Sequence, residues 1–196
     1  MKKLLLSLLV LSFSLVLFSC KKAITAEEAA QWFKDAPVLN VSDNYEVKIV
    51  SSGDDKYTVV LKHSKADDYD YVKIDGHFQN KDYNNQVFEK KEGLANIVNN
   101  AEVAAMVLLV SSLTNTLGQA GKSLLVASGT PGVTVKFYKQ GKGLVISAEA
   151  DSSDAKGTST YTYDQNGNPT KVDVKGTAGD TKQTLVITFK YGKVSK

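Results

Sequence analysis

The chain has 196 residues, of which 42% are hydrophobic and 23% are charged, and its formal net charge is +3. This length is sufficient to bury a hydrophobic core, and the single cysteine leaves no partner for an internal disulfide. Every basic side chain apart from the two histidines is a lysine. Without arginine the chain has no bidentate guanidinium groups for phosphates, which argues against nucleic-acid binding.

The first 20 residues combine a basic start, an apolar run and a cysteine. Two lysines precede the run, which extends from Leu4 to Phe18 and is too short for a comfortable transmembrane helix. These features predict a secretory signal over residues 1–19. The alternatives are an ordinary cleaved signal followed by a chance cysteine and a signal anchor that stays attached.

The end of this run, Leu17-Phe18-Ser19-Cys20, resembles the lipobox of bacterial lipoproteins. The resemblance implies that signal peptidase II cuts before Cys20 and that the thiol carries a diacylglyceryl group. Two or three acyl chains would then anchor the protein in a membrane of the cell envelope. Lys21 replaces the aspartate that is usual for inner-membrane retention, so the outer membrane is favoured.

After this cleavage the chain is almost neutral, with 22 lysines against 21 acidic residues and a net charge of about +1. Residues 20–24 form the lipidated cysteine and a tether, and residues 25–196 a single domain. Thr25 and Glu28 form a capping box for a helix that ends near Asp35. The apolar side of this helix places Trp32 in the core, with a position on the bilayer as the alternative.

From Tyr45 to Leu61 apolar and polar residues alternate on both sides of a polar turn, which predicts a hairpin. A third strand is predicted from Tyr71 to Asp75. Residues 79–86 are polar and are interpreted as a loop.

The centre of the chain has the spacing of a long helix with an end near Gly118. The helix is apolar on every side around residues 103–110, which predicts burial on more than one face. Ser123 to Ala127 is either a further helical turn or a strand. The apolar positions of the long helix are Leu94, Ile97, Val98, Ala101, Ala105, Leu108, Leu109 and Leu113.

The last third of the chain alternates strand patterns with turn signals, as in an antiparallel meander. Asp164 to Asn168 has oxygen ligands at alternating positions, but a hairpin turn explains it better than a calcium loop. The predicted strands are Val133–Lys139, Leu144–Ala150, Thr158–Tyr163, Thr170–Lys175 and Leu185–Tyr191.

Together these elements predict an α+β fold, in which a curved antiparallel sheet of about eight strands packs on the long central apolar helix. The pattern is similar to that of half-barrel domains that carry lipoproteins or lipids across bacterial envelopes. That resemblance implies an apolar cavity between sheet and helix, with plain core packing as the alternative. The residues that would face an apolar ligand are Val103, Met106, Val107 and Val110.

The residues typical of catalytic and metal sites are sparse. His63 and His77 are the only histidines, and a pair with Asp67, Asp68 or Asp70 is conceivable near His63. We therefore expect no metal, no cofactor and no enzymatic activity. Five tyrosines either form an exposed aromatic patch or pack in the core, namely Tyr69, Tyr71, Tyr83, Tyr161 and Tyr163.

The leading hypothesis is a non-enzymatic envelope lipoprotein that binds an apolar ligand or an envelope protein partner. The alternative is a surface-exposed structural or host-contact antigen without a small ligand. Protease treatment of intact cells separates a surface location from a periplasmic one. A third reading, an envelope hydrolase, requires His63 or His77 for turnover.

Overall fold

The computed structural model describes residues 21–36, 44–54, 56–67, 69–78, 81–90, 120–151 and 155–192, and the single positions 105, 108, 112 and 116. None of the helices in this part of the chain is long and apolar enough to cross a membrane.

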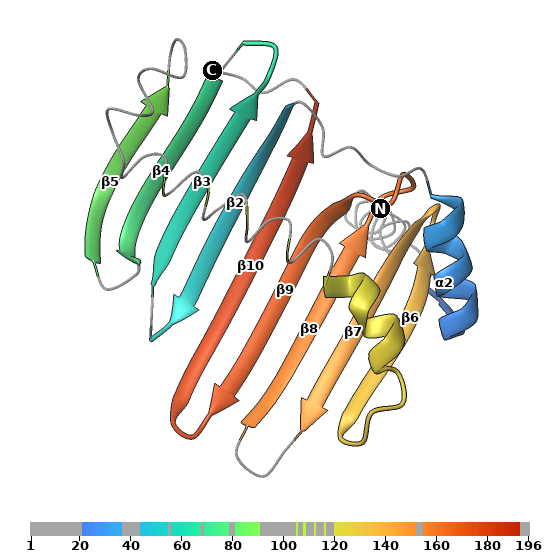
Figure 1. The fold of residues 1–196 in the computed structure, drawn as a ribbon. Coiled ribbons are helices and arrows are strands. Elements are labelled where there is room, and N and C mark those ends of the chain that lie inside the picture. Colours follow the sequence, from blue (N-terminus) through green and yellow to red (C-terminus); the bar gives the residue numbers. More distant parts are fainter. Residues whose placement is uncertain are drawn as a thin grey trace, which may run out of the picture.

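The described chain forms one ten-stranded antiparallel sheet in the order β1-β6-β7-β8-β9-β10-β2-β3-β4-β5 (Figure 1). Two meanders, β2 to β5 and β6 to β10, are joined where β10 pairs with β2, so the last strand lies inside the sheet. The strands are β1 (Lys22–Ile24), β2 (Asn44–Gly53), β3 (Tyr57–Ser64), β4 (Tyr69–Phe78), β5 (Lys81–Lys90), β6 (Val133–Gln140), β7 (Gly143–Asp151), β8 (Ala155–Tyr163), β9 (Pro169–Ala178) and β10 (Thr181–Tyr191).

Alternation along each strand separates an apolar face from a polar one. On β10, Ile187 pairs with Val172 of β9 and with Ile49 of β2. All three side chains are at most 3% exposed. Because the register is kept from strand to strand, these residues form one continuous apolar face across the sheet.

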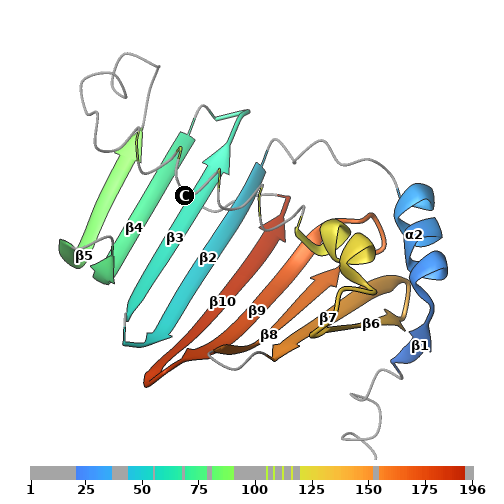
Figure 2. The ribbon, with the colours of Figure 1, turned by 60° about the horizontal axis from the view of Figure 1, so that its bottom comes forward.

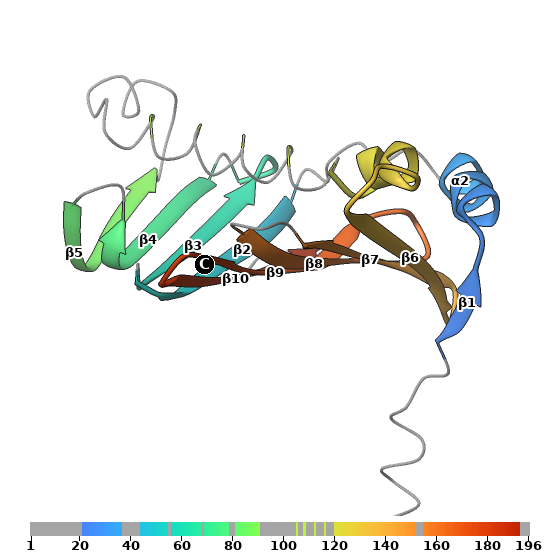
Figure 3. The same ribbon diagram turned by 90° about the horizontal axis from the view of Figure 1, so that it is seen from below.

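Two short helices lie on the apolar side of the sheet (Figures 2 and 3). One is α2 (Ala26–Asp35), and the other comprises residues 120–127. The predicted capping box is confirmed, since the Glu28 amide donates to Thr25 Oγ1 at 3.2 Å and the Thr25 amide donates to Glu28 Oε2 at 2.8 Å. Both helices cover the half of the sheet that contains β6, β7 and β8.

An aromatic cluster holds the two helices against the sheet. The ring of Phe33 meets that of Tyr163 edge to face, with 5.1 Å between centroids, and Trp32 packs beside both. A Cβ atom added at Gly121 would overlap the Tyr163 hydroxyl, so only glycine permits this close approach. Trp32 is partly buried against the core, and its Nε1 donates to the Lys142 carbonyl at 3.2 Å.

The predicted antiparallel sheet is confirmed, but the rest of the predicted fold class needs correction. The described chain is mostly β, with ten strands instead of about eight, two short helices and no long central helix. In the region of that helix, only Ala105, Leu108, Ser112 and Thr116 are described, all helical and exposed. The spacing of apolar residues indicates which of them share one side of a helix. Whether that side is buried depends on how it packs against the strands, which the spacing does not specify. The proposed ligand-facing residues Val103, Met106, Val107 and Val110 lie outside the described residues.

The predicted loop at residues 79–86 is wrong from residue 81 onward, because β5 runs from Lys81 to Lys90 and pairs with β4; residues 79 and 80 lie outside the described residues. As the outermost strand, β5 buries few side chains, namely Tyr83 and Phe88, and tolerates a polar sequence. A register shift between Ile74 and Gly76 also breaks its alternation. The residues 123–127, left open between helix and strand, are helical.

Candidate functional site

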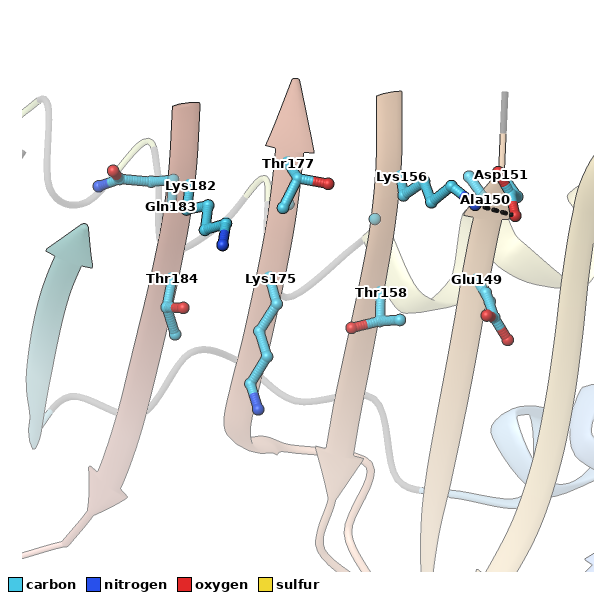
Figure 4. A pocket seen from close by; sticks show the side chains of 12 residues that line it. Glu149, Ala150, Asp151, Lys156, Thr158, Lys175, Thr177, Lys182, Gln183 and Thr184 are labelled. Atoms are coloured by element: carbon cyan, nitrogen blue, oxygen red, sulfur yellow. Dashed lines mark hydrogen bonds and ion pairs between the residues drawn. The ribbon is translucent and has the colours of Figure 1, made fainter. Parts of the chain in front are cut away.

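The polar face of the sheet, opposite the two helices, is hollowed over β7 to β10 (Figure 4). The depression has a volume of about 320 Å³ and is open to solvent. Lysines, threonines and carboxylates from four adjacent strands point over it. The lining residues are Glu149, Ala150, Asp151, Lys156, Gly157, Thr158, Lys175, Gly176, Thr177, Lys182, Gln183 and Thr184.

Strand register places these side chains in two rows across the sheet. One row contains Glu149, Thr158, Lys175 and Thr184, which are successive pairing partners from β7 to β10. The next row runs from Asp151 through Lys156 and Thr177 to Lys182. Gly157 and Gly176 are paired at the register position between the two rows. Because glycine has no side chain, these two positions place none on the opposite face of the sheet behind the depression.

The charges in the depression are unevenly matched. Lys156 Nζ lies 3.0 Å from Asp151 Oδ2, which makes an exposed ion pair. Within the described residues, no ion pair joins Lys175 or Lys182 to a carboxylate. Two lysines are thus left to interact with an outside acidic group, while Glu149 on the β7 side offers a carboxylate to a basic one. Threonine hydroxyls beside them both donate and accept hydrogen bonds.

Both histidines lie outside this depression and form separate pairs with aspartates. His63 Nδ1 lies 2.8 Å from Asp70 Oδ1, its partner across β3 and β4, and the imidazole ring is tilted by 37° to the ring of Tyr45, with 5.1 Å between centroids. His77 Nδ1 lies 2.7 Å from Asp82 Oδ1. Of the three aspartates considered for His63, the sheet register selects Asp70. The described residues contain no group of three or more histidine, cysteine or acidic side chains that could hold a metal ion.

The two other predicted constellations are structural. Asp164 accepts hydrogen bonds from the amides of Asn166 and Asn168, at 2.8 and 2.9 Å, which confirms a hairpin turn. The five tyrosines considered as a patch do not form one, since Tyr161 and Tyr163 face the helices and Tyr71 lies on the polar face. Tyr83, Tyr161 and Tyr163 belong to the buried core, which confirms core packing for these three, whereas Tyr69 is buried beside Tyr71, with which its ring stacks at 6.5 Å between centroids.

Three of the nine tyrosines are expected to ionise well above the ordinary range. Burial, with the nearby Glu89 carboxylate, raises the pKa of Tyr69 to about 12. Burial also raises the pKa of Tyr163 and of Tyr191. Because the folded state favours the neutral phenol, stability is complete below about pH 10 and falls as the pH rises towards the folded pKa. Alkaline titration of phenolate absorbance, run alongside urea unfolding, should show this loss.

The variant Tyr69→Phe tests the assignment, because it removes the ionisable hydroxyl and keeps the ring. Its unfolding free energy should change less between pH 10 and pH 12 than that of the unaltered protein. Simultaneous titration of all nine tyrosines while the sheet remains folded would contradict the effect of burial.

Sequence reasoning missed the depression, although its residues alternate plainly along their strands. Thr158 and Lys175 stand at the ends of predicted strands and Lys182 lies outside them, and the meeting of all three depends on the register of β8, β9 and β10. The lipidation candidate Cys20 lies outside the described residues, which begin directly after it. Neither protein-family models nor curated proteins match this chain.

Proposed function

We propose that this protein is a non-enzymatic lipoprotein of the bacterial envelope, anchored through Cys20, whose polar sheet face binds another envelope protein. The observation that carries the proposal is the charged depression over β7 to β10. It lies on the face of the sheet opposite the two described helices, where lysines, threonines and carboxylates are offered to a partner surface. The outer membrane remains the favoured location because Lys21 follows the cysteine.

A protein partner fits the depression better than an apolar ligand does. The lining offers amines, hydroxyls and carboxylates within one surface, and protein surfaces present complementary groups of both signs. On the apolar face, by contrast, Leu144, Ile146 and Val172 have no exposed surface. The apolar-ligand hypothesis rests on Val103, Met106, Val107 and Val110, which lie outside the described residues.

The proposed role of the depression is binding without catalysis. Its lysines and threonines can hold acidic and polar groups, and Asp151 already pairs with Lys156. The two histidines lie on β3 and β4, whereas the depression is formed by β7 to β10. Charge complementarity of this kind contributes chiefly to specificity and to the rate of association.

Site-specific photo-crosslinking in living cells tests the proposal. A photoreactive residue at Thr158 or Thr184 should give one discrete crosslinked species with an envelope protein. The double variant Lys175→Glu/Lys182→Glu should reduce its yield by about tenfold or more, since two unmatched cations become repulsive to an acidic partner surface. The readout is the crosslinked band and the identity of the partner by mass spectrometry.

The matched control is Lys48→Glu/Lys73→Glu, which changes the net charge equally and lies on the same face over β2 and β4. This control should leave the crosslinked yield unchanged. The absence of any discrete species, or an equal loss in both double variants, would reject the depression as the binding site.

A further inference from the structure

The edge strand β1, which begins two residues after Cys20 in the sequence, and its neighbour β6 carry several basic residues. The segment 21–24 with β1 contains Lys21 and Lys22, and the segment 133–144 with β6 contains Lys136, Lys139 and the turn residue Lys142. All five side chains are exposed. Neither segment contains an acidic residue. Pairing of β1 with β6 brings these segments together, although more than 100 residues separate them.

This basic edge contrasts with the composition of the rest of the mature chain. The other 17 of the 22 mature lysines are outnumbered by all 21 acidic residues. Within the part of the chain that the structure describes, no ion pair links the five lysines of the edge to a carboxylate. The acids nearest to the edge are Glu27 and Glu28 of α2, where Glu28 already accepts the Thr25 amide, and Glu149 of β7, which lies opposite Thr134 of β6. The excess positive charge is therefore local.

The register makes this arrangement electrostatically unfavourable without a partner. Lys22 and Lys139 are direct partners across β1 and β6. Like charges directly opposite each other destabilise an antiparallel pair. Lys142 follows in the turn that connects β6 to β7. An anionic surface would relieve this repulsion by placing negative charge between the ammonium groups.

The position of the edge indicates which anionic surface is within reach. β1 begins at Lys22, two residues after Cys20, a span of about 7 Å at full extension. That span is shorter than the Debye length of about 8 Å at physiological ionic strength. A bilayer that held acyl chains on Cys20 would therefore place its headgroups within electrostatic range of Lys21, Lys22 and Lys139.

We propose that the β1–β6 edge is a membrane-contact surface, whose lysines bind the anionic headgroups of the bilayer that holds Cys20. This inference rests on the lipid anchor of the proposed function. The edge strand β1 and the edge strand β5 lie at opposite ends of the sheet (Figure 3). Contact at β1 stands the sheet away from the membrane with β5 outermost, and leaves the depression over β7 to β10 open to a partner.

The test uses the mature lipoprotein reconstituted into vesicles of phosphatidylcholine alone or with one third phosphatidylglycerol. The protein should float with both kinds of vesicle. Acetylation of Lys22, Lys139 and Lys142, followed by mass spectrometry, should slow by about fivefold on the anionic vesicles, in line with the attraction of each lysine near such a surface. Lys48 and Lys73 should react equally on both, and high salt should remove the difference.

Two double variants isolate the basic edge from net charge. In Lys136→Glu/Lys139→Glu the protection of Lys22 on anionic vesicles should disappear, and Lys136→Gln/Lys139→Gln should weaken it without charge reversal. The control Lys48→Glu/Lys73→Glu should retain full protection. Circular dichroism checks that each variant keeps the sheet. The comparison of the two vesicle compositions uses the unaltered protein, so it does not depend on the folding of any variant.

The outcomes separate the two proposals. A protein that floats with neither vesicle overturns the lipid anchor and with it the premise of this inference. Flotation with both vesicles and equal acetylation of Lys22, Lys139 and Lys142 overturns the membrane contact alone. Loss of protection in the control variant overturns the specific role of the edge. A last control adds dissolved polyglutamate to the protein on neutral vesicles. If it protects Lys22, Lys139 and Lys142 as well as anionic vesicles do, the assignment of the edge to the membrane is overturned.

Discussion

Replacing Ile187 by alanine is expected to lower the free energy of unfolding by about 2 to 5 kcal/mol, the range for large-to-small changes in a packed core. Ile187 is 1% exposed and lies on β10, the strand that joins the two meanders. Its register partners Ile49 and Val172 are also buried. A cavity at this position therefore weakens the packing on both sides of the central strand.

Urea unfolding at constant pH measures this effect, and Val186→Ala provides a matched control. Val186 is the preceding residue of the same strand, so it points to the polar face and is only partly buried. Its replacement should cost about 1 kcal/mol or less, because less apolar surface is lost from a packed environment. Equal destabilisation by the two substitutions would mean that the assignment of the faces on β10 is wrong.

Replacing Cys20 by serine is expected to abolish acylation of the protein and to prevent cleavage before residue 20. In the proposed lipoprotein the lipid is attached through the thiol sulfur of Cys20, and a serine hydroxyl does not substitute for it. The acyl chains of this proposed lipoprotein carry the anchorage of the mature domain. The loss of acylation should be complete, whereas a substitution in the core changes the folding equilibrium only in part.

Metabolic labelling with a fatty-acid probe and mass spectrometry of the N-terminal peptide provide the measurement. Ser19→Ala is the control, because it changes the residue before the cut and keeps it small, so labelling should persist. Labelling of Cys20→Ser at the level of the unaltered protein, or an unacylated Cys20 in the unaltered protein, would refute the lipoprotein proposal.

The two proposed surfaces are compatible within one molecule. The depression lies over β7 to β10, and the basic edge consists of β1 and β6. Lys175 and Lys182 lie on β9 and β10, three and four strands away from β6, so a partner held by them would sit on the sheet face at a distance from the basic edge.

The sequence by itself determined the local structure. Alternation of apolar and polar residues predicted the hairpin of β2 and β3 and the strands of the last third, because a strand with one buried face has period two. Thr25 and Glu28 located the start of α2, since both capping bonds span only three residues. The turn after Asp164 was equally predictable from its own side chains.

Only the tertiary structure decided which strands became neighbours. The pairing of β10 with β2, the selection of Asp70 by His63 and the meeting of Lys175 with Lys182 all depend on register. The basic edge exists because β1 pairs with β6, more than 100 residues later in the chain. Hydrogen bonding between distant strands uses backbone groups that every residue has, and so it leaves no local signal in the side chains.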